Sequence, residues 1–420
     1  MLVDAWLPSA AHRHPARRAV NALTYADLLV RADVMARRLA GRGVGPGDRV
    51  AIVLAPGDAF CIALHAAFRL GAVAVPVDVR LGAAERSEIT RGAKELIDGP
   101  VIAAEDHDVE LAEQHDLDAT AVIVHTSGTS GRPRAIELTY GNWLWSALGS
   151  AVALGLDPEE RWLCTLPLAH VGGLSIVIRS AIYATTAIVH ERFDADHARD
   201  VLMDPEGPTV VSVVPTILQR LLDAGLRRPP RLRWALLGGA PITNALQGRA
   251  AAARVPVAPT YGMTEACSQV TTNGAPLFCT RVRLAEDGEI MVSGPTVSPG
   301  VGGELATGDL GEFMADGALR IEGRKADTIV SGGENVAPAE VEAVLEGHPM
   351  VVEAGVHAVD DPEWGEAIVA TVVTRGPVSE DELYDWCADR LARYKVPKAF
   401  SFAAFLPRTA SGKLLRGSLR

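Results

Sequence analysis

Lysine and paired cysteines are what this sequence has least of. Its 420 residues include only 5 lysines against 35 arginines, and its 5 cysteines are scattered, with no CxxC pair and no metal-type spacing. A dispersed, odd set of cysteines is typical of free thiols in a reducing compartment and argues against a disulfide framework or a zinc site. Four of the five lysines lie in the last quarter of the chain: Lys325, Lys395, Lys398 and Lys413.

An excess of basic charge and long apolar runs are also missing. The formal net charge is −12, which argues against an extended nucleic-acid surface because such a surface needs a basic face. No apolar run approaches the roughly 18 residues of a membrane helix, and the first residues do not form a signal-peptide pattern. We therefore expect a soluble cytoplasmic protein without a nucleic-acid partner or a membrane span. Any anionic ligand then needs a local pocket lined by cations or amides.

Short apolar runs that alternate with amphipathic stretches fill most of the chain. Runs rich in Val and Ile and bounded by Gly or Pro predict buried strands, while the stretches 24–43 and 59–72 predict helices. This alternation is typical of an α/β fold with largely parallel sheets. The predicted strands lie within residues 49–56, 71–79, 121–128, 162–169, 186–193, 209–216, 233–240 and 255–262.

The pattern changes near residue 320. A helix is predicted from about Pro338 to about Gly347, followed by strands at 351–359 and 366–374. The run SEDE at 379–382 forms a capping box ahead of a helix through Leu391. These elements indicate a smaller α+β unit, and we predict two domains, 1–324 and 325–420.

One loop carries the first chemical signal. The apolar run AVIV leads into TSGTSG at 126–131, where two glycines and four hydroxyl side chains stand close to Arg132 and Arg134. A loop of this kind suits a polyphosphate. A Walker A loop is excluded because neither the second-glycine spacing nor the GK[ST] ending is present. On this motif alone, an ordinary surface connection stays an alternative.

The loop is the first of several motifs that resemble those of the acyl-adenylate-forming superfamily of acyl-CoA ligases, adenylation domains and luciferases. The resemblance runs over nearly the whole chain, and the remaining motifs follow in the expected order: LPLAH at 166–170, LLGGAP at 236–241, YGMTE at 261–265, TGDLG at 307–311, GRKADTIVSGGENVAPAEVE at 323–342 and LPRTASGKLLR at 406–416. It implies a large N-terminal domain of packed α/β subdomains and a small mobile C-terminal α+β domain. It also implies ATP, Mg²⁺ and coenzyme A as cofactor and co-substrates.

The resemblance further assigns roles to individual residues. Lys413 would stabilise the charge that develops between the carboxylate and the α-phosphate, Thr264 would contact that phosphate, and Glu265 would bind Mg²⁺. The small domain would rotate about Ala326. The other nucleotide contacts implied are Thr126, Ser127, Gly128, Thr129, Ser130, Gly131, Arg134, Gly238, Gly239, Ala240, Pro241, Tyr261, Gly262, Asp309 and Arg324.

Two departures from the usual family pattern are visible. Arg134 and Ala135 stand where the phosphate loop more often has lysine and glycine, and the aromatic residue common before TGD is absent. Arg134 keeps the positive charge, so we expect the contact with pyrophosphate to be retained.

The region from LAHVGG to HERF is most similar to the 2-succinylbenzoate–CoA ligases of menaquinone biosynthesis. Their substrate has two carboxylates, so the one that does not react needs a cation. Arg179 is our hypothesis for that cation because it stands in the otherwise apolar run GLSIVIRSAIY. A surface ion pair with Asp or Glu is the alternative. His170 would gate the carboxylate, or be a structural histidine, and Ser175 and Gln269 are further candidate polar contacts.

Two other functions stay open at this point. An aryl- or medium-chain acyl-CoA ligase of broader specificity would share every motif. A non-catalytic nucleotide-binding relative would have been indicated by loss of Lys413, Glu265 or Asp309, and all three are present. The assembly is open, with a homodimer as one option.

Overall fold

The computed structural model describes residues 1–100, 108–127, 133–331, 334–362, 364–408 and 414–419. By their contacts these residues form two compact units. Unit 1 comprises Met1–Gly239, Ala253–Arg281 and Val292–Leu305, and unit 2 comprises Ala240–Ala252, Val282–Met291 and Ala306–Arg420. Each unit thus gathers segments that are distant in the sequence, and the split at 324/325 stays a prediction.

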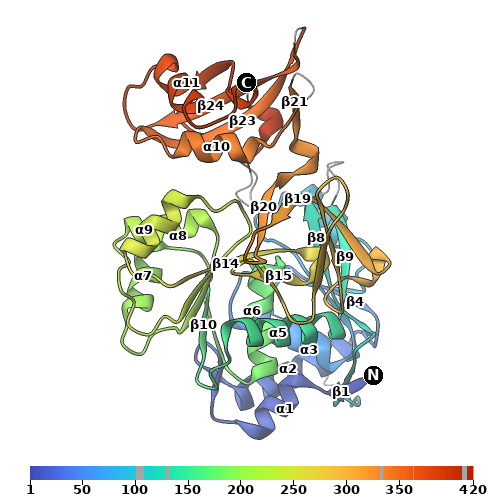
Figure 1. Ribbon diagram of the computed structural model, residues 1–420. Helices are drawn as coiled ribbons and strands as arrows, with labels where there is room; N and C mark the ends of the chain where they lie inside the picture. The colour runs from blue at the N-terminus through green and yellow to red at the C-terminus, as the bar shows by residue number, and fades with distance from the viewer. Residues whose placement is uncertain (101–107, 128–132, 332–333, 363, 409–413, 420) are drawn as a thin grey trace. The chain divides into compact units, whose positions relative to one another are not determined.

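Unit 1 contains a nine-stranded sheet in the order β16-β15-β14-β13-β12-β10-β11-β2-β3. Figure 1 labels β10, β14 and β15 of this sheet. The central strands of the sheet pair in parallel, as the buried Val-rich runs predict. The strands are β2 (Arg18–Val20), β3 (Leu23–Thr24), β10 (Arg161–Cys164), β11 (Thr186–Val189), β12 (Val210–Val213), β13 (Trp234–Leu237), β14 (Val257–Met263), β15 (Ser268–Thr272) and β16 (Ala275–Pro276).

A second sheet in unit 1 has five strands in the order β6-β4-β5-β8-β9. Three of its four pairings are parallel, and β8 pairs with β9 antiparallel. The strands are β4 (Arg49–Ile52), β5 (Val73–Pro76), β6 (Glu95–Ile97), β8 (Thr120–Ser127) and β9 (Pro133–Thr139); β1 (Leu2–Asp4) and β7 (Gln114–Asp116) form a separate antiparallel pair. All eight predicted strands of this half of the chain are confirmed.

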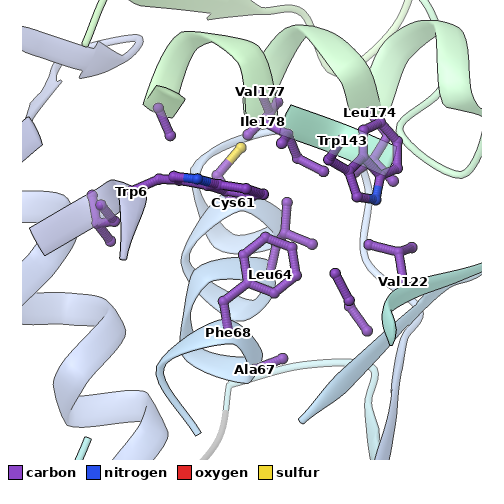
Figure 2. Close-up of a cluster of buried hydrophobic side chains, with 14 of the residues drawn as sticks. Trp6, Cys61, Leu64, Ala67, Phe68, Val122, Trp143, Leu174, Val177 and Ile178 are labelled. Atoms are coloured by element: carbon purple, nitrogen blue, oxygen red, sulfur yellow. The ribbon is translucent and has the colours of Figure 1, made fainter. Parts of the chain in front are cut away.

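The hydrophobic core of unit 1 is formed by side chains from its helices and strands. Figure 2 shows Trp6, Leu64, Phe68 and Trp143 in one cluster with Val177, contributed by helices far apart in the sequence. The helices of unit 1 are α1 (Trp6–Arg13), α2 (Tyr25–Gly41), α3 (Asp58–Arg69), α4 (Ala83–Ile89), α5 (Tyr140–Leu154), α6 (Val171–Tyr183), α7 (Ala195–Met203) and α8 (Pro215–Asp223). The predicted helices at 24–43 and 59–72 are α2 and α3.

Unit 2 contains a four-stranded sheet, in which β19 pairs with β20 antiparallel, and the C-terminal α+β fold. The first sheet has the order β17-β18-β19-β20, and the second has the order β22-β21-β24-β23 with β25 paired to β24. The elements are α9 (Asn244–Ala252), β17 (Arg281–Leu284), β18 (Glu289–Ser293), β19 (Glu304–Phe313), β20 (Leu319–Arg324), β21 (Ile329–Ser331), β22 (Glu334–Val336), α10 (Pro338–Glu346), β23 (Val351–Asp361), β24 (Gly365–Thr374), α11 (Glu380–Ala388) and β25 (Ala399–Phe402).

The end of α11 differs from the sequence prediction by three residues, as does the end of α3, which stops at Arg69 rather than at residue 72. The start of α11 agrees, because the Ser379 side chain accepts a hydrogen bond from the Glu382 backbone as an N-cap. The helix ends at Ala388, three residues before Leu391, where the amides of Arg390 and Leu391 both donate to the Cys387 carbonyl and close a turn. Within the described ranges, no helix is both long and apolar enough to cross a bilayer.

Candidate active site

The β8–β9 hairpin of unit 1 carries the predicted phosphate loop at its tip. Thr126 pairs with Arg134 and Ser127 with Pro133, so the strands lead directly into the loop and out of it. Gly128, Thr129, Ser130 and Gly131 lie outside the described residues. The Arg134 side chain is 62% exposed, and its Nη1 lies 3.8 Å from the Glu265 Oε1. An exposed pair at this distance contributes little stability, which leaves the guanidinium available to an anion.

Glu265 and Thr264 lie in a short 3-10 turn, Thr264–Ala266, between β14 and β15. The Glu265 side chain is 19% exposed, so its carboxylate is partly desolvated yet open to a ligand. A hard cation such as Mg²⁺ takes carboxylate oxygens and often shares them with substrate phosphates. The described part of the chain contains no group of three or more His, Cys, Asp or Glu suited to a metal. The Glu265 carboxylate is the described acidic group beside the phosphate hairpin, within 3.8 Å of Arg134.

The backbone around Glu265 is fixed by a segment that sequence reasoning missed. The Ser298 amide donates to the Glu265 carbonyl at 2.8 Å, and the Ser298 hydroxyl donates to the Glu137 carbonyl in β9 at 2.9 Å. Asn142 of α5 donates to the carbonyls of Pro295 and Val297. These bonds tie the Glu265 turn to the strand that carries Arg134. No spacing signal in the sequence marks Ser298 for this role.

Gly262 and Gly238 are required by backbone packing. A Cβ on Gly262 would lie 1.7 Å from the Ser268 carbonyl oxygen, where β14 and β15 pair with a register shift at Tyr261/Gly262. A Cβ on Gly238 would lie 2.7 Å from the Thr260 side chain and carbonyl, and Gly239 has φ +82°. The nucleotide contacts implied for these glycines stay a prediction beside this structural role. Ala240 and Pro241 continue the turn in unit 2.

Asp309 and Arg324 of unit 2 are brought together by the pairing of β19 with β20, in which they are register partners. The Arg324 Nε lies 2.8 Å from the Asp309 Oδ1, and the Asp309 side chain is only 8% exposed. The Thr307 hydroxyl accepts from the Asp309 amide, and the Thr307 carbonyl accepts from Arg324. These two residues, both implied as nucleotide contacts, thus form one pair.

The predicted swivel at Ala326 lies between two anchored neighbours in unit 2. Lys325 reaches Asp287 at 2.6 Å and Glu289 at 2.8 Å, and these two carboxylates raise its pKa. Asp327 accepts from Arg416 at 2.8 Å, and Arg416 also makes two hydrogen bonds to Glu342. Lys413 lies outside the described residues. The residues on either side of its segment, Arg408 and Leu414, form an antiparallel bridge.

His170 is at the N-terminus of α6, and its Nε2 lies 3.7 Å from the Asp78 Oδ2. Asp78 follows β5 and binds Arg80 at 2.6 Å. Burial acts to raise the Asp78 pKa, but the hydrogen bonds from Arg80 and the charge of His170 outweigh it and lower the pKa below the usual value. Asp78 was not singled out in the sequence, although its position after a buried strand was the available signal.

Ser175 and Arg179 lie one turn apart on α6, and both are almost fully buried, at 2% and 1% exposure. The alternative of a surface ion pair for Arg179 is therefore wrong. Its guanidinium donates to the Ser146 hydroxyl at 2.9 Å and lies 5.8 Å from the Trp162 ring centre. Burial lowers the Arg179 pKa, and no carboxylate bonds to it in the part of the chain that the structure describes.

Gln269 of β15 is buried at 2% exposure, and its amide nitrogen donates to the Thr272 hydroxyl at 2.8 Å. Its Oε1 has no hydrogen-bond partner within the described residues. Buried polar atoms are normally satisfied, so an unsatisfied acceptor is consistent with a ligand contact. Tyr261 is partly buried in β14. The site residues of unit 1 thus stand on β8, β9, β14, β15 and α6 and in the turns that follow β13 and β14.

Comparison with known proteins identifies a family for this chain. The AMP-binding enzyme family model matches residues 7–308, and the model of the AMP-binding enzyme C-terminal domain matches residues 340–413. The 2-succinylbenzoate–CoA ligase of Bacillus licheniformis is 40% identical, with 100% of each chain covered. The structure is similar to that of o-succinylbenzoate CoA synthetase (MenE) from Bacillus subtilis in complex with the acyl-adenylate intermediate OSB-AMP, with a TM-score of 0.91 and 36% identity over 100% of this chain and 98% of that chain. The same enzyme in complex with ATP and magnesium ion matches with a TM-score of 0.91, 36% identity and 100% coverage of both chains.

Proposed function

The chain belongs to the AMP-binding enzyme family, and from this premise we propose that it is an ATP-dependent acid–thiol ligase acting on 2-succinylbenzoate. It forms an acyl-adenylate first and 2-succinylbenzoyl-CoA second. Full-length similarity to 2-succinylbenzoate–CoA ligases supports this reaction. The observation that carries the choice of acid is Arg179, a buried cation on α6 bonded to a neutral hydroxyl rather than to a carboxylate of the protein.

In the first reaction, one carboxylate oxygen of the acid attacks the α-phosphorus of ATP. The bond from that phosphorus to the oxygen bridging to the β-phosphate breaks, and pyrophosphate leaves. The protein needs no nucleophile of its own for this step; it must hold two anions in line and stabilise charge on the phosphoryl oxygens. We propose that Thr126, Ser127 and Arg134 bind the pyrophosphate group, and that Thr264 and Lys413 contact the oxygens that gain charge.

Glu265 is the residue we propose for holding Mg²⁺, since its partly exposed carboxylate stands next to the phosphate hairpin. When bound, Mg²⁺ neutralises charge on the phosphate oxygens. Asp309 and Arg324, already paired in unit 2, are proposed to contact the ribose, and Tyr261 with Gly238–Pro241 to contact adenine.

In the second reaction, the thiol of coenzyme A attacks the acyl carbonyl carbon. The bond from that carbon to the phosphate oxygen breaks, AMP leaves, and the thiol proton is lost to solvent. We propose that the part of the C-terminal domain that follows Ala326 rotates about this residue between the two reactions. The anchoring of Lys325 to Asp287 and Glu289, and of Asp327 to Arg416, supports this proposal because Ala326 is then the backbone link between two held residues.

On the acid side, we propose that Arg179 binds the carboxylate that does not react and that His170 contacts the one that does. Ser175 and Gln269 are proposed as neutral hydrogen-bonding contacts. Burying an arginine without an opposite charge is unfavourable, so its retention beside apolar residues is best explained by an anionic ligand.

The five cysteines are free in the structure, which supports the proposed cytoplasmic location.

A panel of acids tests the proposal. Pyrophosphate release and thioester formation are measured with 2-succinylbenzoate, with benzoate and octanoate, and with two analogues that each lack one of its carboxylates: 4-oxo-4-phenylbutanoate and 2-butyrylbenzoate. We expect kcat/KM to be highest with 2-succinylbenzoate by about 10-fold or more, because one charged hydrogen-bonded contact is lost in every other acid. Comparable values with benzoate or octanoate would favour a broad acyl-CoA ligase, and no pyrophosphate release with any acid would indicate a non-catalytic protein.

A further inference from the structure

Ser146 of α5 stands at the centre of a small buried hydrogen-bond chain in unit 1. The residue is 1% exposed, its Oγ accepts a hydrogen bond from the Arg179 Nη2 at 2.9 Å, and the same Oγ donates to the Cys267 carbonyl at 2.6 Å. A hydroxyl has a single proton, and a guanidinium can only donate. The direction of both bonds is therefore fixed: Arg179 donates to Ser146, and Ser146 donates to Cys267.

One end of this chain is a turn in a rarely adopted backbone conformation. Cys267 has φ +51° and Ser268 has φ +91°, two consecutive residues with side chains in the left-handed region that favours glycine. The turn follows Glu265 by two residues, and the Cys267 amide donates to the Thr264 carbonyl. Such conformations persist when the surroundings hold them and are frequent at functional sites. The Ser146 hydroxyl is one of the groups that hold this turn.

The other end of the chain is the guanidinium of Arg179. Its Nε has no hydrogen-bond partner among the residues that the structure describes, and its Nη2 donates to Ser146. A guanidinium is a planar fork, and fixing one of its nitrogens restricts the direction in which the others point. Ser146 therefore limits the orientation of the cation and contacts the Glu265 turn with the same atom.

We propose that Ser146 is a positioning residue for the acid: it orients Arg179 toward the spare carboxylate. This inference rests on the proposed function. It adds a specific consequence, because Ser146 acts on binding of the acid through Arg179. Removing the hydroxyl should weaken the binding of a dicarboxylic substrate and leave unchanged that of an analogue with no carboxylate to spare.

The test compares Ser146→Ala with Ser150→Ala in the full-length protein. Ser150 lies one turn further along α5 and is equally buried, so both variants lose one hydroxyl from the same helix. We expect Ser146→Ala to raise KM for 2-succinylbenzoate about 5- to 10-fold, as loss of one hydrogen bond to the cation implies. KM for ATP, and KM for whichever monocarboxylic analogue is turned over, should stay within 2-fold, as should every value for Ser150→Ala. Ser146→Thr, which keeps the hydroxyl, should restore KM for 2-succinylbenzoate.

A double variant separates positioning from a general structural effect. In an Arg179→Gln background, Ser146→Ala should cause no further rise in KM for 2-succinylbenzoate, because the residue through which it acts is gone. Equal rises for the dicarboxylate, the analogue and ATP would overturn the proposal, and so would an unchanged KM in Ser146→Ala when Arg179→Gln alone raises it. If Ser146→Ala does not fold, Ser146→Cys, of similar size and with a weaker acceptor, gives the same comparison.

Failure of the proposed function is distinguishable from failure of this inference. If the unaltered protein does not activate 2-succinylbenzoate at all, the proposed function is wrong and the role of Ser146 in binding that acid falls with it. If the unaltered protein activates 2-succinylbenzoate and Arg179→Gln raises its KM while Ser146→Ala does not, only the inference about Ser146 is wrong.

Discussion

Arg179 in unit 1 and Arg416 in unit 2 are both arginines withdrawn from solvent, yet their partners differ. Arg179 is 1% exposed and bonds to a serine hydroxyl. The Arg416 side chain is 23% exposed and bonds to Asp327 and Glu342, each at 2.8 Å. The more deeply buried cation therefore has the weaker partner. This is the reverse of what stability alone would favour, because desolvating a charge costs more the deeper it lies.

Three other cations of unit 2 are paired with carboxylates as Arg416 is. Arg408 bonds to Glu353, Lys395 to Glu340, and Lys325 to two carboxylates. In unit 2 the protein thus supplies the opposite charge where a cation fixes the fold. Where it leaves a buried cation with a neutral partner, as at Arg179, the opposite charge can come from an anionic substrate. This difference separates structural cations from ligand-directed ones.

Loss of Lys413 is expected to have the largest effect. Lys413 is in the same tail as Arg416, but its proposed partner is a reacting oxygen rather than a carboxylate of the protein. Lys413→Ala should lower the rate of acyl-adenylate formation by about 100-fold or more, as removal of a group that stabilises transition-state charge does. ATP should still bind and the melting temperature should not change. Pyrophosphate release and calorimetric ATP titration measure these quantities.

A second tail lysine is the control for this variant. Lys398 lies over the Trp364 ring, with its Nζ 4.3 Å from the ring centre, and has no proposed role in the reaction. Lys398→Ala should retain nearly full activity. An acyl-adenylate rate in Lys413→Ala equal to that of the unaltered protein would place Lys413 with the structural cations and remove it from the mechanism.

Arg179→Gln tests the ligand-directed side of the comparison. It removes a charge that binds the spare carboxylate, so KM for 2-succinylbenzoate should rise about 10-fold or more, with kcat less affected. The free energy of unfolding should not fall, because the variant removes a buried charge without leaving an opposite charge unpaired. Steady-state kinetics and urea unfolding provide the two measurements. An unchanged KM would remove Arg179 from the site.

Arg416→Gln tests the structural side. It leaves Glu342, whose side chain is 10% exposed, without its cation, and the free energy of unfolding should fall by roughly 2–3 kcal/mol, less than for a wholly buried pair. The control is Arg390→Gln, since Arg390 is exposed and lies over the Trp386 ring. Urea unfolding of the full-length variants measures the difference. Equal stability of the two variants would mean that the Arg416 pairs do not stabilise unit 2.

Much of the fold could be predicted from the sequence, because buried parallel strands are continuous apolar runs of limited length. All eight runs of the N-terminal half became strands of two sheets. The grouping of segments into units could not be predicted. Residues 240–252 and 282–291 join the C-terminal unit through contacts between distant residues, and no local pattern encodes such contacts.

The candidate site was predictable where residues stand in motifs and not where they act through packing. Thr264, Glu265, Asp309 and Arg324 stand in the motifs of the resemblance. Asp78, Ser146 and Ser298 became visible only through their bonds to His170, Arg179 and Glu265. A buried serine on a helix looks the same in a sequence whether its hydroxyl meets a guanidinium or a helix carbonyl.

The smallest expected effect is a difference in how the two units respond to pH. In unit 1, burial lowers the pKa of His65 to about 4 and that of His115 to about 3. These histidines are neutral when folded, so their contribution to stability is present above about pH 6.5 and is lost as the pH falls toward the folded values. In unit 2, burial, helped by the charges of Glu342 and Glu353, raises the pKa of Glu346 to about 7 against the effects of the Ala354 amide and Arg408.

The sign for Glu346 is therefore opposite to that for the histidines. A carboxyl whose pKa is raised on folding stabilises the folded state when the pH is below the pKa that the group has in the unfolded chain, near 4.5. This contribution is lost as the pH rises through about 7, the pKa in the folded protein. Glu346→Gln keeps an acceptor for the Ala354 amide but cannot ionise. Its free energy of unfolding should exceed that of the unaltered protein at pH 8, and this excess should become smaller toward pH 5. Urea unfolding from pH 5 to 8 measures both, and an equal difference at the two pH values would show that Glu346 does not titrate as its burial implies.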